Sequence, residues 1–298
     1  MSWQLYRWVW QLESPLHIGL GPAGSLNRTR LYAPARALWG ALAAEWARRQ
    51  GASFPDYHAV GVRLREWTRL SYLFPAEQVG EGWCAWLPEY REERGLVWLR
   101  EDGKGPVEDR VLRRWLLTTR PGTAIAPDSD TAEEGSLREY EVISDLSHWG
   151  EGAEAPRPVG LVGYIFLADH QAAGGLLKEL LKIDLVFLGG DTRYGLGRLR
   201  RVEGLARAAS HFFGEPVDLQ AEKPVVTTAR VLAHTVTKEA FCGALEYLAG
   251  WDVVSGGLRR IDLVWAPGSK SQDGSGGGKP AHFRLQKEGL WRQEAWSP

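Results

Sequence analysis

The feature that most constrains this chain is a glycine-rich segment at residues 187–201, with the sequence FLGGDTRYGLGRLRR. Four glycines, Gly189, Gly190, Gly195 and Gly197, lie close together in it. Glycine adopts positive φ angles readily and lets the backbone approach another group closely. The segment therefore predicts a sharply turned loop, and successive amide groups in such a loop can form an anion-binding concavity.

The side chains around these glycines are cationic and aromatic, and include Arg193, Tyr194 and Arg198. Guanidinium groups and backbone amides bind phosphate oxygens, and an exposed tyrosine ring can stack on a base. A tight hairpin with solvated arginines explains the same residues equally well. On its own, the segment indicates an anion-binding turn and no more.

Composition limits the class of protein. A chain of 298 residues with 44% hydrophobic residues is long enough for a packed core in one large or two small domains. The net charge of −1 means that any nucleic-acid surface must be a local patch. Only two cysteines occur, far apart, which excludes a disulfide framework and a zinc-type cysteine pair. The sequence has no signal-peptide pattern and no long uncharged apolar run, so we expect a cytoplasmic protein without a membrane span.

A second cationic cluster, Arg28, Arg30 and Arg36, comes just before a helix predicted over residues 37–49. The apolar residues of that stretch recur at helical spacing, and Pro34 stands where a helix begins. A helix N-terminus with guanidinium groups nearby is a natural phosphate site. An ordinary solvated loop is about as compatible with the cluster.

The remaining pattern alternates between strands and helices. An acidic, turn-rich passage occupies residues 128–154, residues 14–27 are rich in turn formers, and residues 267–280 predict a mobile Gly/Ser-rich loop. The order of elements fits an α+β protein with a ferredoxin-like split βαβ unit better than a doubly wound sheet. The other expected strands lie at 3–13, 60–73, 82–100 (a hairpin), 159–168, 225–237 and 282–286, and the other expected helices at 172–182 and 238–249.

The sequence also lacks the motifs of several other classes of enzyme. Residues 19–24 match a dinucleotide-binding glycine pattern, but neither an immediate helix nor a suitably placed acidic residue follows. The histidines have no metal-ligand spacing, so we expect no metal and no cofactor. A nucleophile elbow and a P-loop are also absent from the sequence.

Three blocks of the sequence resemble the RAMP superfamily of CRISPR-associated proteins, and they occur in that family's order. Residues 14–19 with 29–42 resemble its first loop and opening helix, residues 120–143 resemble its inserted hairpin, and residues 189–200 resemble its glycine-rich loop. From Leu205 onward the sequence shows little resemblance.

The resemblance implies a ferredoxin-like, RRM-related RAMP domain over residues 1–204, with an insertion around residues 101–156. The pattern after it predicts a smaller α+β segment at residues 205–298, read as a degenerate second ferredoxin-like unit. The resemblance further implies that the chain is a non-catalytic backbone or end-capping subunit that binds guide RNA in a type III-like CRISPR ribonucleoprotein for antiviral defence. The implied partners are guide RNA, target RNA, other RAMP subunits and a large polymerase-like subunit.

Carried over block by block, the resemblance gives a set of residues expected at the RNA. They are Arg28, Arg30 and Arg36 in the first block, Arg120 and Thr123 on the hairpin, and Gly189, Gly190, Arg193, Tyr194, Gly195, Gly197 and Arg198 in the glycine-rich loop.

The first block departs from the family in two ways. Target-cleaving members usually carry an aspartate between the first strand and the first helix, and residues 14–34 contain none, so we expect no target cleavage. Residues 33–36, Ala-Pro-Ala-Arg, replace a Pro-Gly-Ser-Ser-like turn. Guide-processing members cut RNA by general acid–base chemistry, usually with a histidine. His17 therefore leaves a metal-independent endoribonuclease as one alternative, and an RNA-binding module unrelated to CRISPR is another.

Overall fold

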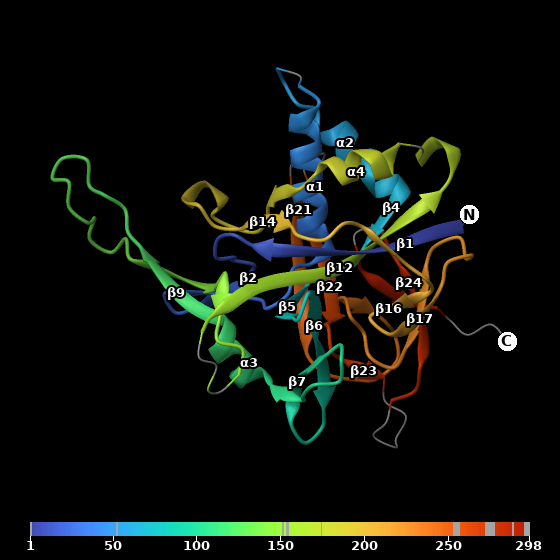
Figure 1. The fold of residues 1–298 in the computed structure, drawn as a ribbon. Helices are drawn as coiled ribbons and strands as arrows, with labels where there is room; N and C mark the ends of the chain where they lie inside the picture. Colours follow the sequence, from blue (N-terminus) through green and yellow to red (C-terminus); the bar gives the residue numbers. More distant parts are fainter. Residues whose placement is uncertain are drawn as a thin grey trace.

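The centre of the molecule is a long antiparallel pair of strands, β1 (Ser2–Leu12) and β12 (Arg157–Asp169), which crosses the whole fold (Figure 1). This computed structural model describes residues 2–51, 53–150, 152, 155–173, 175–252, 257–271, 278–287 and 289–294. Residues 159–168 of β12 are all buried. Burial on both faces explains the nearly continuous apolar run that predicted this strand.

On either side of this pair lie β14 (Arg198–Arg201) and β5 (Phe74–Val79), so the central order is β14-β1-β12-β5. All neighbours in this order are antiparallel. Further strands extend the sheet: β13 (Leu185–Phe187) beyond β14, then β6 (Gly82–Arg91), β7 (Gly95–Arg100) and β8 (Val107–Glu108) beyond β5, with β4 (Thr68–Leu70) and β11 (Leu146–Ser147) on β12 and β15 (Ala206–Ala208) on β1.

Three helices gather on one side of this sheet: α1 (Ala35–Arg49), α2 (Tyr57–Trp67) and α4 (Leu176–Lys182) (Figure 1). The helix α1 begins after Pro34, as the sequence predicts, and its apolar side buries Leu38, Leu42 and Trp46. The predicted helix at 172–182 is confirmed from residue 176 onward, because a short 3₁₀ turn, η1 (Gln171–Ala173), precedes it.

The strand predicted over residues 60–73 is wrong for most of its length, because α2 occupies residues 57–67 and only β4 is extended. The Asp56 carboxylate accepts a hydrogen bond from the Ala59 amide at 2.8 Å and so caps the helix. Val60 and Leu64 are buried one turn apart. These two residues of the expected strand therefore belong to one helical face.

An inserted hairpin projects far from the rest of the molecule (Figure 1). It consists of β9 (Leu117–Gly122) and β10 (Arg138–Ile143), and it follows α3 (Asp109–Leu116). Its base belongs to a four-stranded sheet of order β2-β3-β10-β9. The strands β2 (Gly19–Ala23) and β3 (Leu26–Thr29) form a hairpin inside residues 14–27, where the sequence predicted only turns.

The C-terminal part of the chain is built from strands. Its largest sheet has the order β16-β17-β18-β24-β25-β19-β22-β21, and β20 pairs separately with β23. Their bounds are β16 (His211–Phe212), β17 (Glu215–Asp218), β18 (Val225–Thr228), β19 (Thr235–Val236), β20 (Phe241–Cys242), β21 (Leu245–Asp252), β22 (Gly257–Trp265), β23 (Lys270–Ser271), β24 (Ala281–Leu285) and β25 (Trp291–Gln293).

The helix predicted over residues 238–249 is therefore wrong, since β20 and β21 lie there. The apolar residues at helical spacing also suit a strand, and pairing of β21 with β22 decides between the two. No helix occurs after residue 204 among the residues that the structure describes, so the expected α+β character of this segment is not found. Residues 272–277 of the predicted mobile loop lie outside the described residues, and Gly268 beside them accepts a hydrogen bond from the Tyr90 amide at 2.7 Å.

One hydrophobic core runs through both parts of the chain. Phe212, Phe283 and Trp291 of the C-terminal sheet belong to the same buried cluster as Trp8 and Phe166 of the central strands. This shared core holds the C-terminal sheet against the central sheet, which places β21 beside α1 (Figure 1).

Among the described residues, no helix has the length and apolar character that a bilayer span requires.

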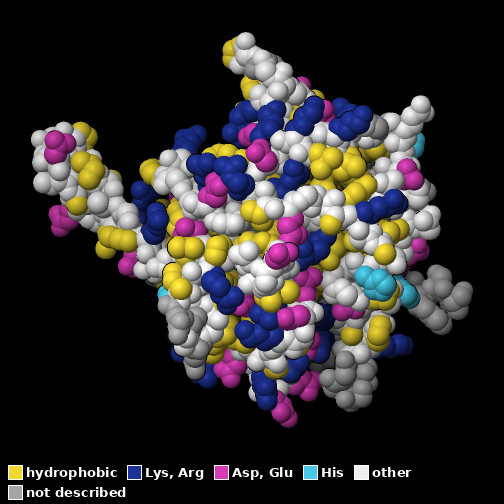
Figure 2. All heavy atoms as spheres, in the orientation of Figure 1, with side chains coloured by type: hydrophobic (Ala, Val, Ile, Leu, Met, Phe, Trp, Pro, Cys, Tyr) yellow, Lys and Arg dark blue, Asp and Glu magenta, His cyan; other side chains and the backbone are white. Residues whose placement is uncertain are grey.

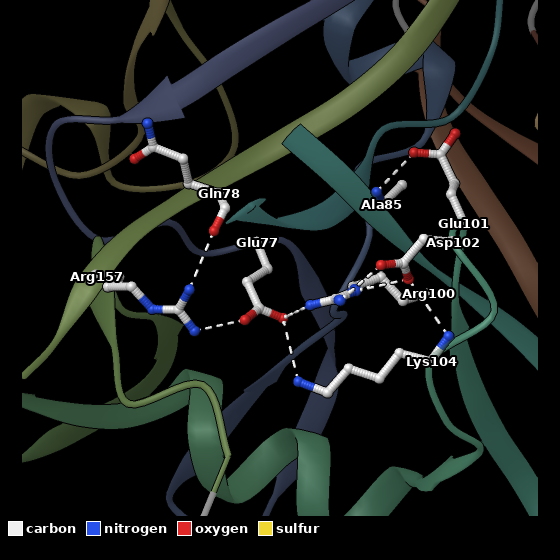
Figure 3. A network of polar contacts seen from close by, with 8 residues as sticks. All are labelled: Glu77, Gln78, Ala85, Arg100, Glu101, Asp102, Lys104 and Arg157. Carbon is white, nitrogen blue, oxygen red and sulfur yellow. Dashed lines mark hydrogen bonds and ion pairs between the residues drawn. The ribbon is translucent and has the colours of Figure 1, made fainter. Parts of the chain in front are cut away.

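A buried carboxylate ties the middle of the large sheet together (Figure 3). The side chain of Glu77 on β5 is 2% exposed and accepts a hydrogen bond from Arg100 Nη1 at 2.6 Å. Arg157 at the start of β12 binds the second carboxylate oxygen, and Asp102 holds the other side of the Arg100 guanidinium at 2.7 Å. A buried charge must be paired in this way to be tolerated.

Replacing Glu77 with Gln keeps the side chain's shape and removes its charge. We expect a loss of about 2 kcal/mol in the free energy of unfolding, because two charged hydrogen bonds in a buried place are weakened. Urea denaturation of the full chain measures this. The exposed Glu81→Gln variant serves as a control and should change stability by less than about 0.5 kcal/mol; equal effects of the two substitutions would contradict the structural role of Glu77.

Candidate nucleic-acid interface

A groove of about 920 Å³ opens where the first loop, α1, the glycine-rich loop and β21 meet. Its charged lining residues, among those the structure describes, are Arg30, Arg36 and Arg48, and no Asp or Glu lines it. The rest of the lining is apolar, aromatic or glycine, with His17 and Thr192 as further polar residues. The groove therefore combines positive charge with apolar surface.

The surface near this groove is also basic. On the face drawn in Figure 2, Lys and Arg side chains gather over the helical end of the molecule, beside exposed apolar side chains. The helices contribute Arg48 and Arg49 from α1 and Arg63 and Arg65 from α2. Because the net charge of the chain is close to zero, binding to a polyanion requires a local cationic patch of this kind.

The glycine-rich loop is docked on the chain's own first loop by backbone hydrogen bonds. The Gly190 amide donates to the His17 carbonyl at 2.9 Å, and the Gly197 amide donates to the Pro15 carbonyl at 2.8 Å. The Leu188 amide donates to the Gly197 carbonyl at 2.8 Å and closes the loop. These two glycine amides are thus already bonded to protein carbonyls.

Two glycines of this loop are required by close contacts within the protein. Gly189 has φ of 88°, and a Cβ there would overlap the His17 carbonyl oxygen. Gly197 has φ of 72°, and a Cβ there would overlap the Leu188 carbonyl oxygen. Gly195 also has a positive φ, of 84°, but faces open space. The glycine pattern therefore reports how the loop packs on residues 15–17.

The side chains of the loop divide into free-standing and paired ones. Tyr194 is 76% exposed and Arg193 is exposed beside it. Arg198 instead pairs with Glu13 at 2.7 Å, and its backbone amide donates to Ser14 Oγ at 2.9 Å. Of the three expected RNA contacts here, Arg193 and Tyr194 point into solvent and Arg198 is held against β1.

The first arginine cluster also divides. Arg28 on β3 is exposed, and Arg36 at the start of α1 is half-buried in the groove lining. Arg30 is paired with Glu246 of β21, with Nη2 to Oε2 at 2.8 Å, and its guanidinium also donates to the Gly19 carbonyl. The structure therefore brings Arg30 and Arg36 to one groove, with Arg30 fixed by the C-terminal segment.

Glu246 is the centre of a buried polar cluster that sequence reasoning did not find. His234 Nε2 lies 3.2 Å from its carboxylate, His234 Nδ1 lies 2.7 Å from the Tyr72 hydroxyl, and the Tyr32 hydroxyl donates to Glu246 Oε1 at 3.2 Å. A neutral His234 with its proton on Nε2 satisfies these partners, donating to Glu246 and accepting from Tyr72.

The ionisation of this cluster follows from its burial and pairing. Burial lowers the pKa of His234 below its usual 6.5, although Glu246 opposes that shift. Burial alone would raise the pKa of Glu246, but the hydrogen bond from His234 and the charge of Arg30 prevail and lower it to about 2. Glu246 is therefore the fixed anion that holds Arg30 at the groove.

His17 and the hairpin residues occupy different places. The His17 side chain lines the groove but is only 7% exposed, and its Nδ1 lies 2.8 Å from the Glu141 carbonyl of β10. Arg120 and Thr123 are exposed on the projecting hairpin and do not line the groove, and Thr123 Oγ1 bonds Ser136 Oγ at 2.6 Å. The hairpin pair is thus separate from the loop residues.

Several lining residues were missed from the sequence, among them Arg48, Phe187 and Tyr247. Arg48 lies in the last turn of the predicted helix, where an arginine is favourable for the helix dipole alone and so gives no sign of a binding role. Tyr247 lies in the stretch misread as helical. Phe187 opens the glycine-rich segment, but it was not named among the residues expected at the RNA.

We expect Gly197→Ala to disrupt the docking of the glycine-rich loop on residues 15–17. The added Cβ combines a strained positive φ with a backbone overlap, so the free energy of unfolding should fall by about 3 kcal/mol. Gly195→Ala carries only the strain, about 1 kcal/mol, and is the matched control. Denaturation midpoints of the two variants test this, and equal losses would show that the close approach at residue 197 is unimportant.

The Glu246 cluster makes stability depend on pH in a defined direction. A carboxyl whose pKa falls from 4.5 to about 2 on folding stabilises the protein fully above pH 4.5, and this contribution is lost as the pH falls from there. The lowered pKa of His234 acts in the same direction below pH 6.5. Urea midpoints measured against pH should therefore drop on acidification, and Glu246→Gln should be less stable near neutral pH with a gap that narrows below pH 4.5. Exposed Glu239→Gln is the control; a gap that stays constant with pH would refute this assignment.

Comparison with known proteins places this geometry in a family. The sequence matches the model of the RAMP superfamily over residues 11–200. No curated protein sequence matches the chain.

Solved structures share the fold at low sequence identity. One chain of the type III-B Cmr-beta complex bound to cognate target RNA and AMPPnP aligns with a TM-score of 0.54 and 11% identity, covering 89% of this chain and 85% of that one. A chain of the same type of complex bound to cognate target RNA aligns with a TM-score of 0.50 and 12% identity, covering 90% and 86%. These likenesses concern the mixed α+β architecture. Because the family match runs from the end of β1 through the glycine-rich loop, over more than half of the chain, this protein belongs to the RAMP superfamily.

Proposed function

We propose that this chain is an RNA-holding subunit of a type III CRISPR ribonucleoprotein effector, which binds guide RNA and does not cut it. The observation that carries the proposal is the groove, whose charged lining is three arginines with no carboxylate among the described residues. Phosphate groups are the natural occupants of such a lining, because arginine binds them with a planar, bidentate fork.

The positions of the groove arginines suit a chain of phosphates rather than one small anion. Arg30 directly follows β3, Arg36 is in the first turn of α1 and Arg48 is in its last turn. They therefore line the groove along the length of a helix of 15 residues, on the order of 20 Å. Arg28, Arg193 and Tyr194 are exposed on the adjoining loops and extend the same surface.

Family and fold support the setting of this activity. The chain belongs to the RAMP superfamily, and its fold is similar to chains of Cmr-beta complexes bound to cognate target RNA. The central order β14-β1-β12-β5, with α1 and α4 in the two crossings, supports a ferredoxin-like unit over residues 1–204. Other RAMP subunits, a large polymerase-like subunit and a cytoplasmic location belong to the same proposal, and the projecting hairpin with Arg120 and Thr123 is the part proposed to reach the guide–target duplex.

Several observations favour holding over cutting. The loop at residues 14–34 has no aspartate, and His17 is nearly buried with one ring nitrogen bonded to a backbone carbonyl. General acid–base catalysis needs a side chain within reach of the proton it transfers. Within the described part of the chain, no group of three or more His, Cys, Asp or Glu side chains is placed to hold a metal ion.

The combined variant Arg36→Ala, Arg48→Ala tests the proposal. We expect weaker binding to single-stranded RNA and a slope of log affinity against log salt that is shallower by about 2, since each lost phosphate contact releases about one fewer counterion. Fluorescence anisotropy with a labelled RNA at several salt concentrations measures both quantities.

The matched control is Arg94→Ala, Arg110→Ala, which removes two exposed arginines away from the groove. If both double variants change the salt slope equally, the groove is not the RNA site. The RNA is recovered after metal-free incubation and checked for length. Discrete products that disappear in His17→Ala would replace the holding role with a guide-processing endoribonuclease.

A further inference from the structure

We propose that Tyr247 of the C-terminal strand β21, together with Phe187, is a stacking site for an unpaired nucleobase at the groove. The inference rests on the proposed RNA-holding function and assigns a role to the C-terminal segment. Tyr247 is 64% exposed, Phe187 is 38% exposed, and both line the groove that holds Arg30, Arg36 and Arg48.

The strand β21 is built to present Tyr247. Its neighbour Glu246 turns to the other side of the strand, where it is fixed by Arg30, His234 and Tyr32. Successive side chains of a strand point to opposite faces, so anchoring Glu246 leaves Tyr247 on the open face. The ring is thus placed by a neighbour whose own position is set by three polar partners.

A β-bulge in the partner strand β22 lies beside Tyr247. The register of β21 against β22 shifts between Tyr247 and Ala249, so that Leu248 faces two residues of the partner strand. The extra residue is therefore on β22, which is the strand that bends here, and bulges are frequent beside functional sites. The bend occurs where Tyr247, Leu248 and Ala249 all line the groove.

Phe187 brings a second ring from a different sheet of the protein. It is the last residue of β13 and stands directly before the glycine-rich loop, whose Gly189 and Gly190 continue the lining. Since the backbone of those glycines is docked on His17, the ring at Phe187 is carried by a fixed loop. Two aromatic residues on rigid supports lose little entropy on stacking.

Charge selects the occupant. An apolar peptide would fit exposed aromatic side chains, and Leu245 and Leu263 near Tyr247 are exposed as well. Arg30 is already paired with Glu246, and Arg48 lies 3.9 Å from Glu45, but no Asp or Glu lines the groove itself. Such a lining complements a phosphodiester chain, and stacking platforms beside a cationic groove are typical of single-stranded nucleic-acid sites. We therefore commit to single-stranded RNA, with one base on Tyr247 and its flanking phosphates toward Arg36 and Arg48.

The test uses the full chain and a labelled single-stranded RNA in anisotropy titrations at several salt concentrations. Tyr247→Ala should weaken binding about 5-fold to 100-fold while the salt slope stays unchanged, because a stacked base carries no counterion. Tyr247→Phe keeps the ring and should bind nearly as the native chain does. Tyr57→Ala, which removes a 50% exposed tyrosine on α2 outside the groove, is the matched control.

An RNA series with single abasic positions separates stacking from loss of fold. When the base that stacks on Tyr247 is removed, the native chain should bind the RNA more weakly than it binds the intact RNA. The Tyr247→Ala variant should bind that abasic RNA as well as it binds the intact RNA. If Tyr247→Ala binds like Tyr57→Ala while Arg36→Ala, Arg48→Ala binds weakly, the stacking site is overturned and the RNA-holding function stands. If the native chain binds no single-stranded RNA, both are overturned; a Tyr247→Ala defect seen only in binding a protein would assign this surface to a protein partner instead.

Discussion

At the groove, one partly buried carboxylate joins parts of the chain that are far apart in sequence. Glu246 lies in the C-terminal sheet, yet its ligands Arg30 and Tyr32 come from the segment that leads into α1. Behind it, His234 connects to Tyr72 at the edge of the central sheet. Without this anion, the Arg30 guanidinium would be a half-buried cation lacking its partner, at a considerable cost in free energy. The same contact joins β21 to the segment that leads into α1, and both line the groove.

The glycine-rich loop illustrates how one sequence pattern can serve two purposes. Its glycines permit close backbone approaches, to the His17 carbonyl of the first loop at Gly189 and to the Leu188 carbonyl of the same segment at Gly197. Once docked, the loop presents Arg193 and Tyr194 to solvent and Thr192 to the groove. Packing and ligand binding are therefore not competing explanations: the docked backbone is the support on which exposed side chains are displayed.

Sequence reasoning succeeded where one periodicity dominated. The strands β1 and β12, the helix α1 and the hairpin at 82–100 have patterns with a single reading, and all are found. It failed at 60–73 and 238–249, where short apolar runs suit both a helix and a strand and distant pairing decides. The candidate site shows the same limit. Arg36, Gly189 and Gly190 were named and line the groove, whereas Arg48, Phe187 and Tyr247 were missed because nothing local links them. Nor could sequence reveal that Arg30 has Glu246 as a partner 216 positions away.

The projecting hairpin has a mechanical consequence. Its strand β10 does not end at a flexible tether but continues into a parallel pairing with β3, and its Glu141 carboxylate accepts from the Thr29 amide at 2.9 Å. The backbone carbonyl of the same residue holds the His17 ring, and the His17 carbonyl in turn holds the Gly190 amide. These hydrogen bonds connect the hairpin mechanically to the residues that line the groove, so a displacement of the hairpin is transmitted to them. Whatever grips the outer end of this arm also loads the loop that carries Phe187.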